Sequence, residues 1–271
     1  MRRSIIARHG LLTLAVLVTL APIAFMAMTS LKSEEEYSGD RVGLPANPTF
    51  ENISTVLDDP NLSTWILNSV LITLGSVLLA MVAGVLAAYP MARSEGWWPK
   101  GLLPGLVLLL AVPPVVLVVP LFIMMVNLEL LNSKLGVILT YAGLLTPLAT
   151  YLMVGFIRGI PPELDEAAAI DGAGRARVLW HVILPVMRPA LVTLAVVAAV
   201  YVWNEFLIAL LFLQTQESQT LVVGVASLRG RFDINEPLLM AWSLVASLPV
   251  IVAFLFGQRY FARGLVAGAL K

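Results

Sequence analysis

Few residues in this chain of 271 could carry covalent or metal chemistry. Cysteine is absent, which excludes disulfides, thiolate metal sites and thiol catalysis. The two histidines, His9 and His181, each stand alone, outside any spacing typical of metal ligands. A phosphate-binding loop needs the pattern G-x-x-x-x-G-K-[ST], and no lysine in the chain follows a glycine. The sequence therefore predicts no enzymatic activity and no metal or cofactor bound by this polypeptide itself.

One acid, Glu205, lies within an otherwise charge-free apolar stretch that reads YVWNEFLIAL. An acid at the centre of a membrane helix costs about 2.5–3.5 kcal/mol on insertion scales, so it should face a partner or water. Two interpretations are equally open: Glu205 lines or gates the route of a transported solute, or it makes a structural hydrogen bond to another helix. Asn204, Asn68 and Asn127 are weaker candidates of the same kind.

The composition requires these residues to sit in a polytopic membrane protein of the all-α class. The chain is 59% hydrophobic and 13% charged, against about 45–50% and about 25% in soluble domains. A bilayer core needs roughly 20 apolar residues for each spanning helix. We expect one transmembrane domain over residues 1–271 with six spans, at about 11–31, 66–91, 101–127, 136–157, 189–213 and 237–257. A cleaved signal peptide is the alternative for the first span, although its apolar run is long for that role.

The charges predict that both termini are cytoplasmic. Cytoplasmic loops carry an excess of Lys and Arg. With the N-terminus inside, only five of the 17 Lys and Arg residues fall in outer segments, namely Lys32, Arg41, Lys134, Arg229 and Arg231. The long, acidic first outer loop should hold a short helix at 53–57, capped by Asn52.

The third span contains a proline pair, Pro113 and Pro114, between Pro104 and Pro120. Proline removes a backbone donor and clashes with the preceding turn, so the pair should kink or break the helix near mid-membrane. Irregular backbone at that depth is tolerated only against protein or a wet cavity. The pair therefore either borders the translocation route or has consequences for packing alone.

Small residues recur every four positions in the second span, at Ser76, Ala80, Gly84 and Ala88. This spacing lets two helix backbones approach closely in lipid. Packing within the chain and an intersubunit seam are both consistent with it.

A polar segment, EAAAIDGAGRARVLWHVILP at 166–185, separates the fourth and fifth spans. A helix should start at Pro161–Pro162 with acids in its first turn, and Gly172 should end it by adopting a positive φ. A second helix should follow, with Val178, Leu179, Val182 and Ile183 on one apolar face, and should end at Pro185 and Pro189. The loop at 158–188 is thus a helical elbow with a small, exposed tip at 169–173. Lying flat on the lipid surface is an alternative for the basic second helix only.

The segment resembles the EAA signature of permease subunits of binding-protein-dependent ABC importers. In this chain the pattern reads Glu166-Ala167-Ala168, then Gly172, then Val182-Ile183-Leu184-Pro185, with Val182 in place of the usual Ile. Asp171 and Ala173 fit the common DGA form. The six-span layout, LPANPTFENISTVL, WNEF and the tail QRYFARGLVAGALK are similar to the second permease of maltose-type carbohydrate-uptake systems.

The resemblance implies a type I ABC importer permease fold in a bacterial or archaeal plasma membrane. It implies that Glu166, Ala167, Ala168, Asp171, Gly172 and Ala173 form a coupling helix that docks on an ATP-hydrolysing subunit. The implied partners are a second homologous permease, two ATP-binding subunits that bind ATP and Mg, and an extracytoplasmic solute-binding protein; nucleic acid is not among them. The implied cargo is a sugar or related polyol. Candidate residues of the translocation path are Glu205, Asn204, Asn68, Pro113 and Pro114.

Alternatives differ in class. Importers of glycerol phosphate or amino acids share the EAA elbow. A self-sufficient secondary transporter is a second possibility, although such proteins commonly show internal repeats and several intramembrane ionisable groups. An intramembrane enzyme lacks any nucleophile–base or metal pattern in this sequence.

Overall fold

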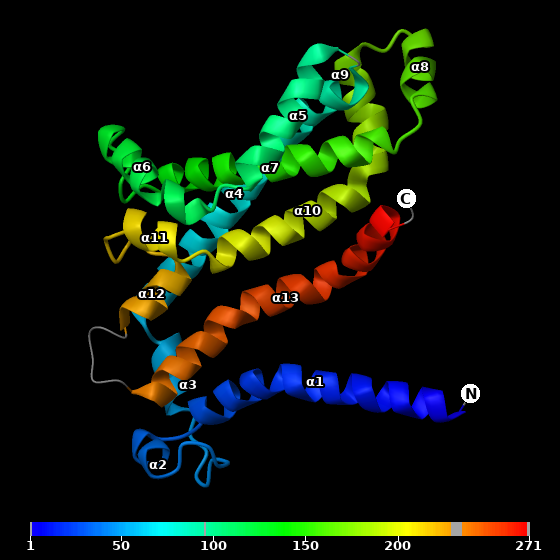
Figure 1. Cartoon of the computed structure of the whole chain (residues 1–271). Coiled ribbons are helices and arrows are strands. Elements are labelled where there is room, and N and C mark those ends of the chain that lie inside the picture. Colours follow the sequence, from blue (N-terminus) through cyan, green and yellow to red (C-terminus); the bar gives the residue numbers. More distant parts are fainter. Residues whose placement is uncertain (1, 95, 229–234, 270–271) are drawn as a thin grey trace. The chain divides into compact units, whose positions relative to one another are not determined.

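The computed structural model describes residues 2–94, 96–228 and 235–269, and within these ranges it consists of helices joined by loops, with no strand (Figure 1). Side chains at 2–7, 99–100, 253–254 and 256–269 lie outside the described set. The helices are α1 (Arg2–Ser30), α2 (Glu34–Gly39), α3 (Glu51–Leu57), α4 (Pro60–Arg93), α5 (Trp97–Leu110), α6 (Pro114–Asn127), α7 (Lys134–Arg158), α8 (Glu163–Ile170), α9 (Arg175–Val178), the π-helical segment η1 (Leu179–Ile183), α10 (Leu184–Asn204), α11 (Leu207–Phe212), α12 (Leu221–Leu228) and α13 (Glu236–Ala269).

Contacts divide the chain into two compact units, one of residues 1–65 with 221–249 and one of residues 66–220 with 250–271. In the first unit, the loop after α1 is held by buried polar contacts. Lys32 is 1% exposed and its ammonium donates to the Asp40 carbonyl at 2.7 Å. The Asp40 carboxylate accepts from the backbone N–H of Gly43 and of Val42, which lowers the pKa of Asp40 below its ordinary 3.8.

Asn52 does not cap the short outer helix, contrary to the sequence prediction. The helix α3 begins two residues earlier than predicted, at Glu51, with Phe50 at the cap position and no side-chain cap bond. The Asn52 amide instead donates to the backbone carbonyls of Ser30 and Lys32, at 3.0 and 2.8 Å. These carbonyls lie at the end of α1 and just beyond it, where helix carbonyls have no partner within the helix, so Asn52 satisfies the terminus of a different helix.

A pair of tryptophans packs in the same unit. Trp65 and Trp242 lie with ring centroids 5.6 Å apart, and each is 2% exposed. Gly224 lies so close to Trp65 that an added Cβ would come within 2.4 Å of the indole ring. Glycine at 224 is therefore needed for close approach, not for its backbone conformation.

Four described helices are long and apolar enough to cross a membrane: Arg8–Ser30, Pro60–Arg93, Lys134–Arg158 and Arg175–Asn204. They correspond to the first, second, fourth and fifth predicted spans. The third predicted span is a bent pair, and Glu236–Val252 is a shorter apolar helix within the sixth. Part of the predicted 237–257 span lies outside the described side chains, so six spans with cytoplasmic termini remain a prediction.

The proline pair breaks the third predicted span, as expected. Helix α5 ends at Leu110 and α6 starts at Pro114, with a bend of 95° between them. Pro113 sits in an extended conformation at the cap position of α6, and Pro114 occupies its first turn, where a missing N–H costs nothing.

The helix at the fifth predicted span, 189–213, differs from that range at both ends. One continuous helical run extends from Arg175 to Asn204, and the chain then breaks at Glu205 before the short helix α11. The predicted stop at Pro185 and Pro189 does not occur, because the turn before Pro185 widens into η1. There Leu184 N–H bonds to the Leu179 carbonyl, five residues back. The wider turn keeps the proline ring from clashing with the carbonyl of the preceding turn, so the helix continues.

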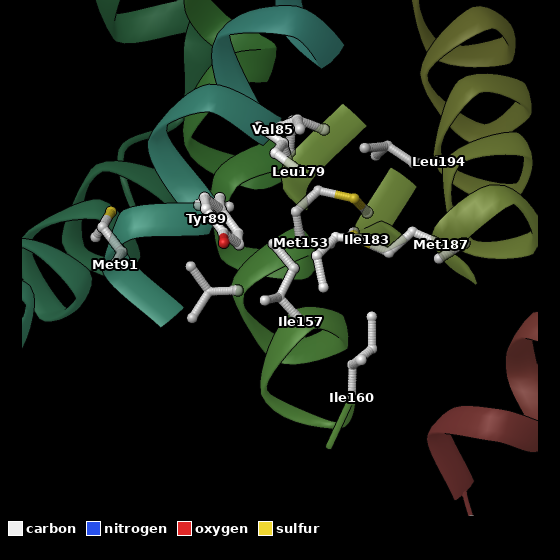
Figure 2. Packing of buried hydrophobic residues seen from close by; sticks show 14 of the residues in the cluster. Val85, Tyr89, Met91, Met153, Ile157, Ile160, Leu179, Ile183, Met187 and Leu194 are labelled. Carbon is white, nitrogen blue, oxygen red and sulfur yellow. The ribbon is translucent and has the colours of Figure 1, made fainter. Parts of the chain in front are cut away.

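The core of the second unit is a cluster of apolar side chains from α4, α7, η1 and α10 (Figure 2). Met153, Ile157 and Ile183 are fully buried in this cluster, and Tyr89 is 8% exposed. Within the small-residue stripe of α4, Gly84 packs against α7: a Cβ added there would lie 2.7 Å from the Ala149 methyl and 3.1 Å from backbone atoms. Packing within the chain therefore accounts for Gly84.

Candidate functional site

The elbow predicted between the fourth and fifth spans forms around α8, which lies at one end of the second unit (Figure 1). Pro162 occupies its cap position, and Glu163, Asp165 and Glu166 stand in its first turn, where the positive end of the helix dipole favours acids. The three alanines that follow have the highest helix propensity. Sequence reasoning located this helix correctly.

A glycine-dependent motif ends α8. Gly172 has φ +79°, its N–H bonds to the Ala169 carbonyl at 3.0 Å, and the N–H of Ala173 bonds to the Ala168 carbonyl at 2.9 Å. This pair of bonds is the Schellman motif, which satisfies the last carbonyls of a helix and needs a left-handed residue. The predicted positive φ at Gly172 is confirmed.

The tip of the elbow is exposed. Glu166, Ala167, Asp171 and Gly172 are exposed, whereas Ala168 and Ala173 are half-buried and touch the apolar core cluster. Sequence reasoning described the tip as small and missed Ile170, a bulky apolar side chain that is 87% exposed. The signal was available, because Ile170 is the one large apolar residue between the acids and the glycine. The tip of the elbow is therefore small except for one bulky apolar side chain.

The second helix of the elbow has the predicted apolar face. Val178, Leu179 and Ile183 are buried and Val182 is half-buried, all in contact with the core cluster. His181 is exposed, and its ring Nδ1 lies 3.2 Å from the Arg177 carbonyl one turn earlier. Among the described residues no group of acids and histidines could hold a metal ion.

Asp165 joins the elbow to the end of α4, a connection that sequence reasoning missed. An oxygen of its carboxylate lies 2.8 Å from the Arg93 guanidinium, and the Tyr89 hydroxyl donates to the other oxygen at 2.8 Å. A cavity of about 630 Å³ lies beside these groups, lined among others by Trp98, Glu166 and Arg175. Nothing in the local sequence pattern indicates the contact, since more than seventy residues separate its two sides.

Glu205 lies in the break between α10 and α11. Its carboxylate accepts from the backbone N–H groups of Leu207, Ile208 and Ala209, and the Tyr141 hydroxyl of α7 donates to the same group. Of the two interpretations drawn from sequence, a structural hydrogen bond to another helix is therefore present. The role of Glu205 in the translocation path remains a prediction.

The other path candidates do not join Glu205 in one network. The Asn204 amide donates to the Val200 carbonyl of its own helix. Asn68 is fully buried and its amide donates to the carbonyls of Glu217 and Gln219, at 2.8 and 2.9 Å. These bonds fasten the loop before α12 to α4. Pro113 and Pro114 lie at the α5–α6 break described above, and their place on a route also remains a prediction.

Comparison with known proteins identifies the fold and the family. The family model for the binding-protein-dependent transport system inner membrane component matches residues 80–267. The chain belongs to this family. The permease is 37% identical to the melibiose/raffinose/stachyose import permease protein MelC of Bacillus subtilis (strain 168), over 95% of each chain. It is 35% identical to the trehalose transport system permease protein SugB of Mycobacterium tuberculosis, over 96% of this chain and 95% of that one.

A solved structure of a bacterial ABC transporter involved in the import of the acidic polysaccharide alginate has the same fold as the permease. The TM-score is 0.83 at 24% identity, over 96% of this chain and 97% of that chain. The permease is therefore an all-α, multi-pass plasma-membrane protein and a transport component of an ABC importer. Family membership decides against a self-sufficient secondary transporter.

Proposed function

We propose that this chain is the non-catalytic permease subunit of an ATP-driven importer for a neutral oligosaccharide or related polyol, with ATP hydrolysed by separate subunits. The observation that carries the proposal is the exposed elbow of α8 and Gly172, which stands out from the apolar core with none of its own residues fully buried. A short polar helix with an exposed tip is suited to contact another protein and unsuited to hydrocarbon.

The elbow acts as a mechanical handle on the cytoplasmic side. Glu166 and Asp171 present exposed charge, Ala167 and Gly172 let a partner approach closely, and Ala168 and Ala173 anchor the tip to the core cluster. Closure of two ATP-binding subunits around ATP and Mg would draw the elbows of two permeases together. The spans would then rock between inward-facing and outward-facing arrangements, a change between two packed states.

The names of the relatives and the negative charge of Glu205 support the proposed class of solute. MelC and SugB are named for uncharged oligosaccharides. In this chain both Glu205 oxygens already accept hydrogen bonds. A carboxylate near the route would repel an anionic solute such as glycerol phosphate.

The proposed assembly contains a second, homologous permease, two ATP-binding subunits and an extracytoplasmic solute-binding protein. In this arrangement the binding protein rests on the acidic outer loop around α2, which carries Glu34, Glu35 and Glu36 in its first turn.

Purification of the native complex from membranes tests the proposal. We expect an ATPase to copurify, with hydrolysis that rises only when the cognate binding protein and solute are both added. A panel of oligosaccharides, monosaccharides, glycerol phosphate and amino acids then identifies the solute class. Uphill solute movement by this chain alone in liposomes would refute the proposal.

A further inference from the structure

Three side chains connect α8 to the end of α4, and we name them the Asp165 latch: Asp165, Arg93 and Tyr89. Arg93 is the last residue of α4, and Tyr89 lies one turn before it. Each binds a different oxygen of the Asp165 carboxylate, both at 2.8 Å. The Arg93 contact is an ion pair, and the Tyr89 contact is a hydrogen bond to a charged acceptor, a kind that is shorter and stronger than a neutral one.

Little else joins the two helices. No residue of α8 is buried, and a cavity of about 630 Å³ lies between α8 and the ends of α4 and α5. Ala168 and Ala173 touch the core cluster, but a methyl group offers a small contact area. In the described part of the chain, the Asp165 latch is thus the polar link across this cavity.

Asp165 on α8 and Tyr89 on α4 occupy positions from which a movement of α8 can be transmitted to α4. On α8, Asp165 directly precedes the exposed Glu166. Successive residues of an α-helix point about 100° apart. One face can therefore meet a partner while the other holds α4. On α4, the Tyr89 ring is 8% exposed and belongs to the core cluster (Figure 2). Close-packed interiors transmit displacement because they cannot deform continuously.

We propose that the Asp165 latch transmits movement of the elbow to α4, so that ATP hydrolysis in the partner subunits is coupled to rearrangement of the second span. Asp165, Arg93 and Tyr89 are positioning residues in this role. The inference rests on the proposed function and deepens it, since it names how the docked elbow moves the membrane helices. Without the latch, α8 keeps its own caps and still docks, but α4 no longer follows it.

The experiment uses the complete complex in proteoliposomes with its binding protein, and measures solute uptake and phosphate release in the same sample. For Asp165→Asn, which keeps the side-chain shape but removes the charge that Arg93 binds, we expect solute moved per ATP to fall roughly fivefold or more, the range of typical coupling effects. Tyr89→Phe should give a smaller fall. The matched control is Glu163→Gln, an acid in the same first turn that is exposed and makes no ion pair in the described structure. It should keep the wild-type ratio.

Exchanging the two charged residues distinguishes a loss of coupling from a loss of folding. The double variant Arg93→Asp with Asp165→Arg should restore the ratio to within about twofold of wild type, because it rebuilds the pair in reverse. An unchanged ratio in an assembled Asp165→Asn complex would overturn the latch while leaving the proposed function intact. Loss of assembly in that variant, without rescue by the exchange, would overturn the latch as well, since Asp165 would then serve folding. Absence of a copurifying ATPase from the wild-type complex would overturn the proposed function and the latch together.

Discussion

Replacing Gly172 by valine isolates the backbone geometry of the elbow. Gly172 has φ +79°, and a Cβ built there meets nothing within 4 Å. A new side chain therefore clashes with no neighbour, and the cost is purely conformational. Left-handed backbone costs a non-glycine residue roughly 1–2 kcal/mol, and a β-branched residue lies at the upper end or beyond it.

The size of the effect follows from that strain. With about 2 kcal/mol against the native turn and 1.4 kcal/mol for each factor of ten, the native elbow becomes roughly 30-fold less favoured. Leaving the turn also breaks the two bonds that close α8, from Gly172 to Ala169 and from Ala173 to Ala168. We expect Gly172→Val to lower solute uptake about tenfold or more when the elbow is needed for docking.

The assay is uptake normalised to the amount of permease in the membrane, together with the yield of copurified ATPase. Insertion should be normal, because the substitution adds an apolar side chain outside the spans. Gly172→Asn is the matched control, since asparagine tolerates the left-handed region, and it should retain most of the uptake. Wild-type uptake by Gly172→Val would refute the docking role, and equal losses in the two variants would refute the backbone explanation.

Three further outcomes follow from contacts elsewhere. Gly84→Val should destabilise the second unit by about 1–3 kcal/mol through overpacking against Ala149; thermal unfolding measures it, with Gly155→Val, where a Cβ meets nothing within 4 Å, as the control. Glu205→Gln should lower the thermal midpoint of the purified complex, because an amide NH₂ would face backbone donors; reduced uptake per complex at an unchanged midpoint would instead place Glu205 on the solute route. The pKa of Asp40 is lowered, so its loop hydrogen bonds are present above pH 3.8 and are lost as pH falls through that lowered value; amide hydrogen exchange in the loop should quicken over that range, and a rate without any such rise would contradict the assignment.

Local features of the elbow and spans were predictable because their causes are local. Acids and alanines favour the start and body of α8, and only glycine fits the positive φ at position 172 at no steric cost. The break between α5 and α6 follows from Pro113 and Pro114, whose rings forbid a continuous helix. Each of these depends on residues within a few positions of one another.

Features that depend on distant partners were not predictable in this way. Asn52 suits a cap by residue type, yet it binds carbonyls at the end of α1. Pro185 suits a helix stop, yet packing of Ile183 in the core favours a wider turn over a break. The partners of Asp165 lie more than seventy residues away, and no spacing in the sequence encodes that contact.

Helix α8 is stabilised at its two ends and not by burial of its side chains. An eight-residue helix is too short to persist in water by propensity alone, since nucleation outweighs the few bonds that follow. With no buried residue, α8 gains little from the hydrophobic effect within this chain. It is instead held at both ends, by acids and the Asp165 latch at its start and by Gly172 at its close. A segment held at both ends while Ile170 stays 87% exposed suits the docking role that we propose, because preorganisation lowers the entropy lost when a partner binds.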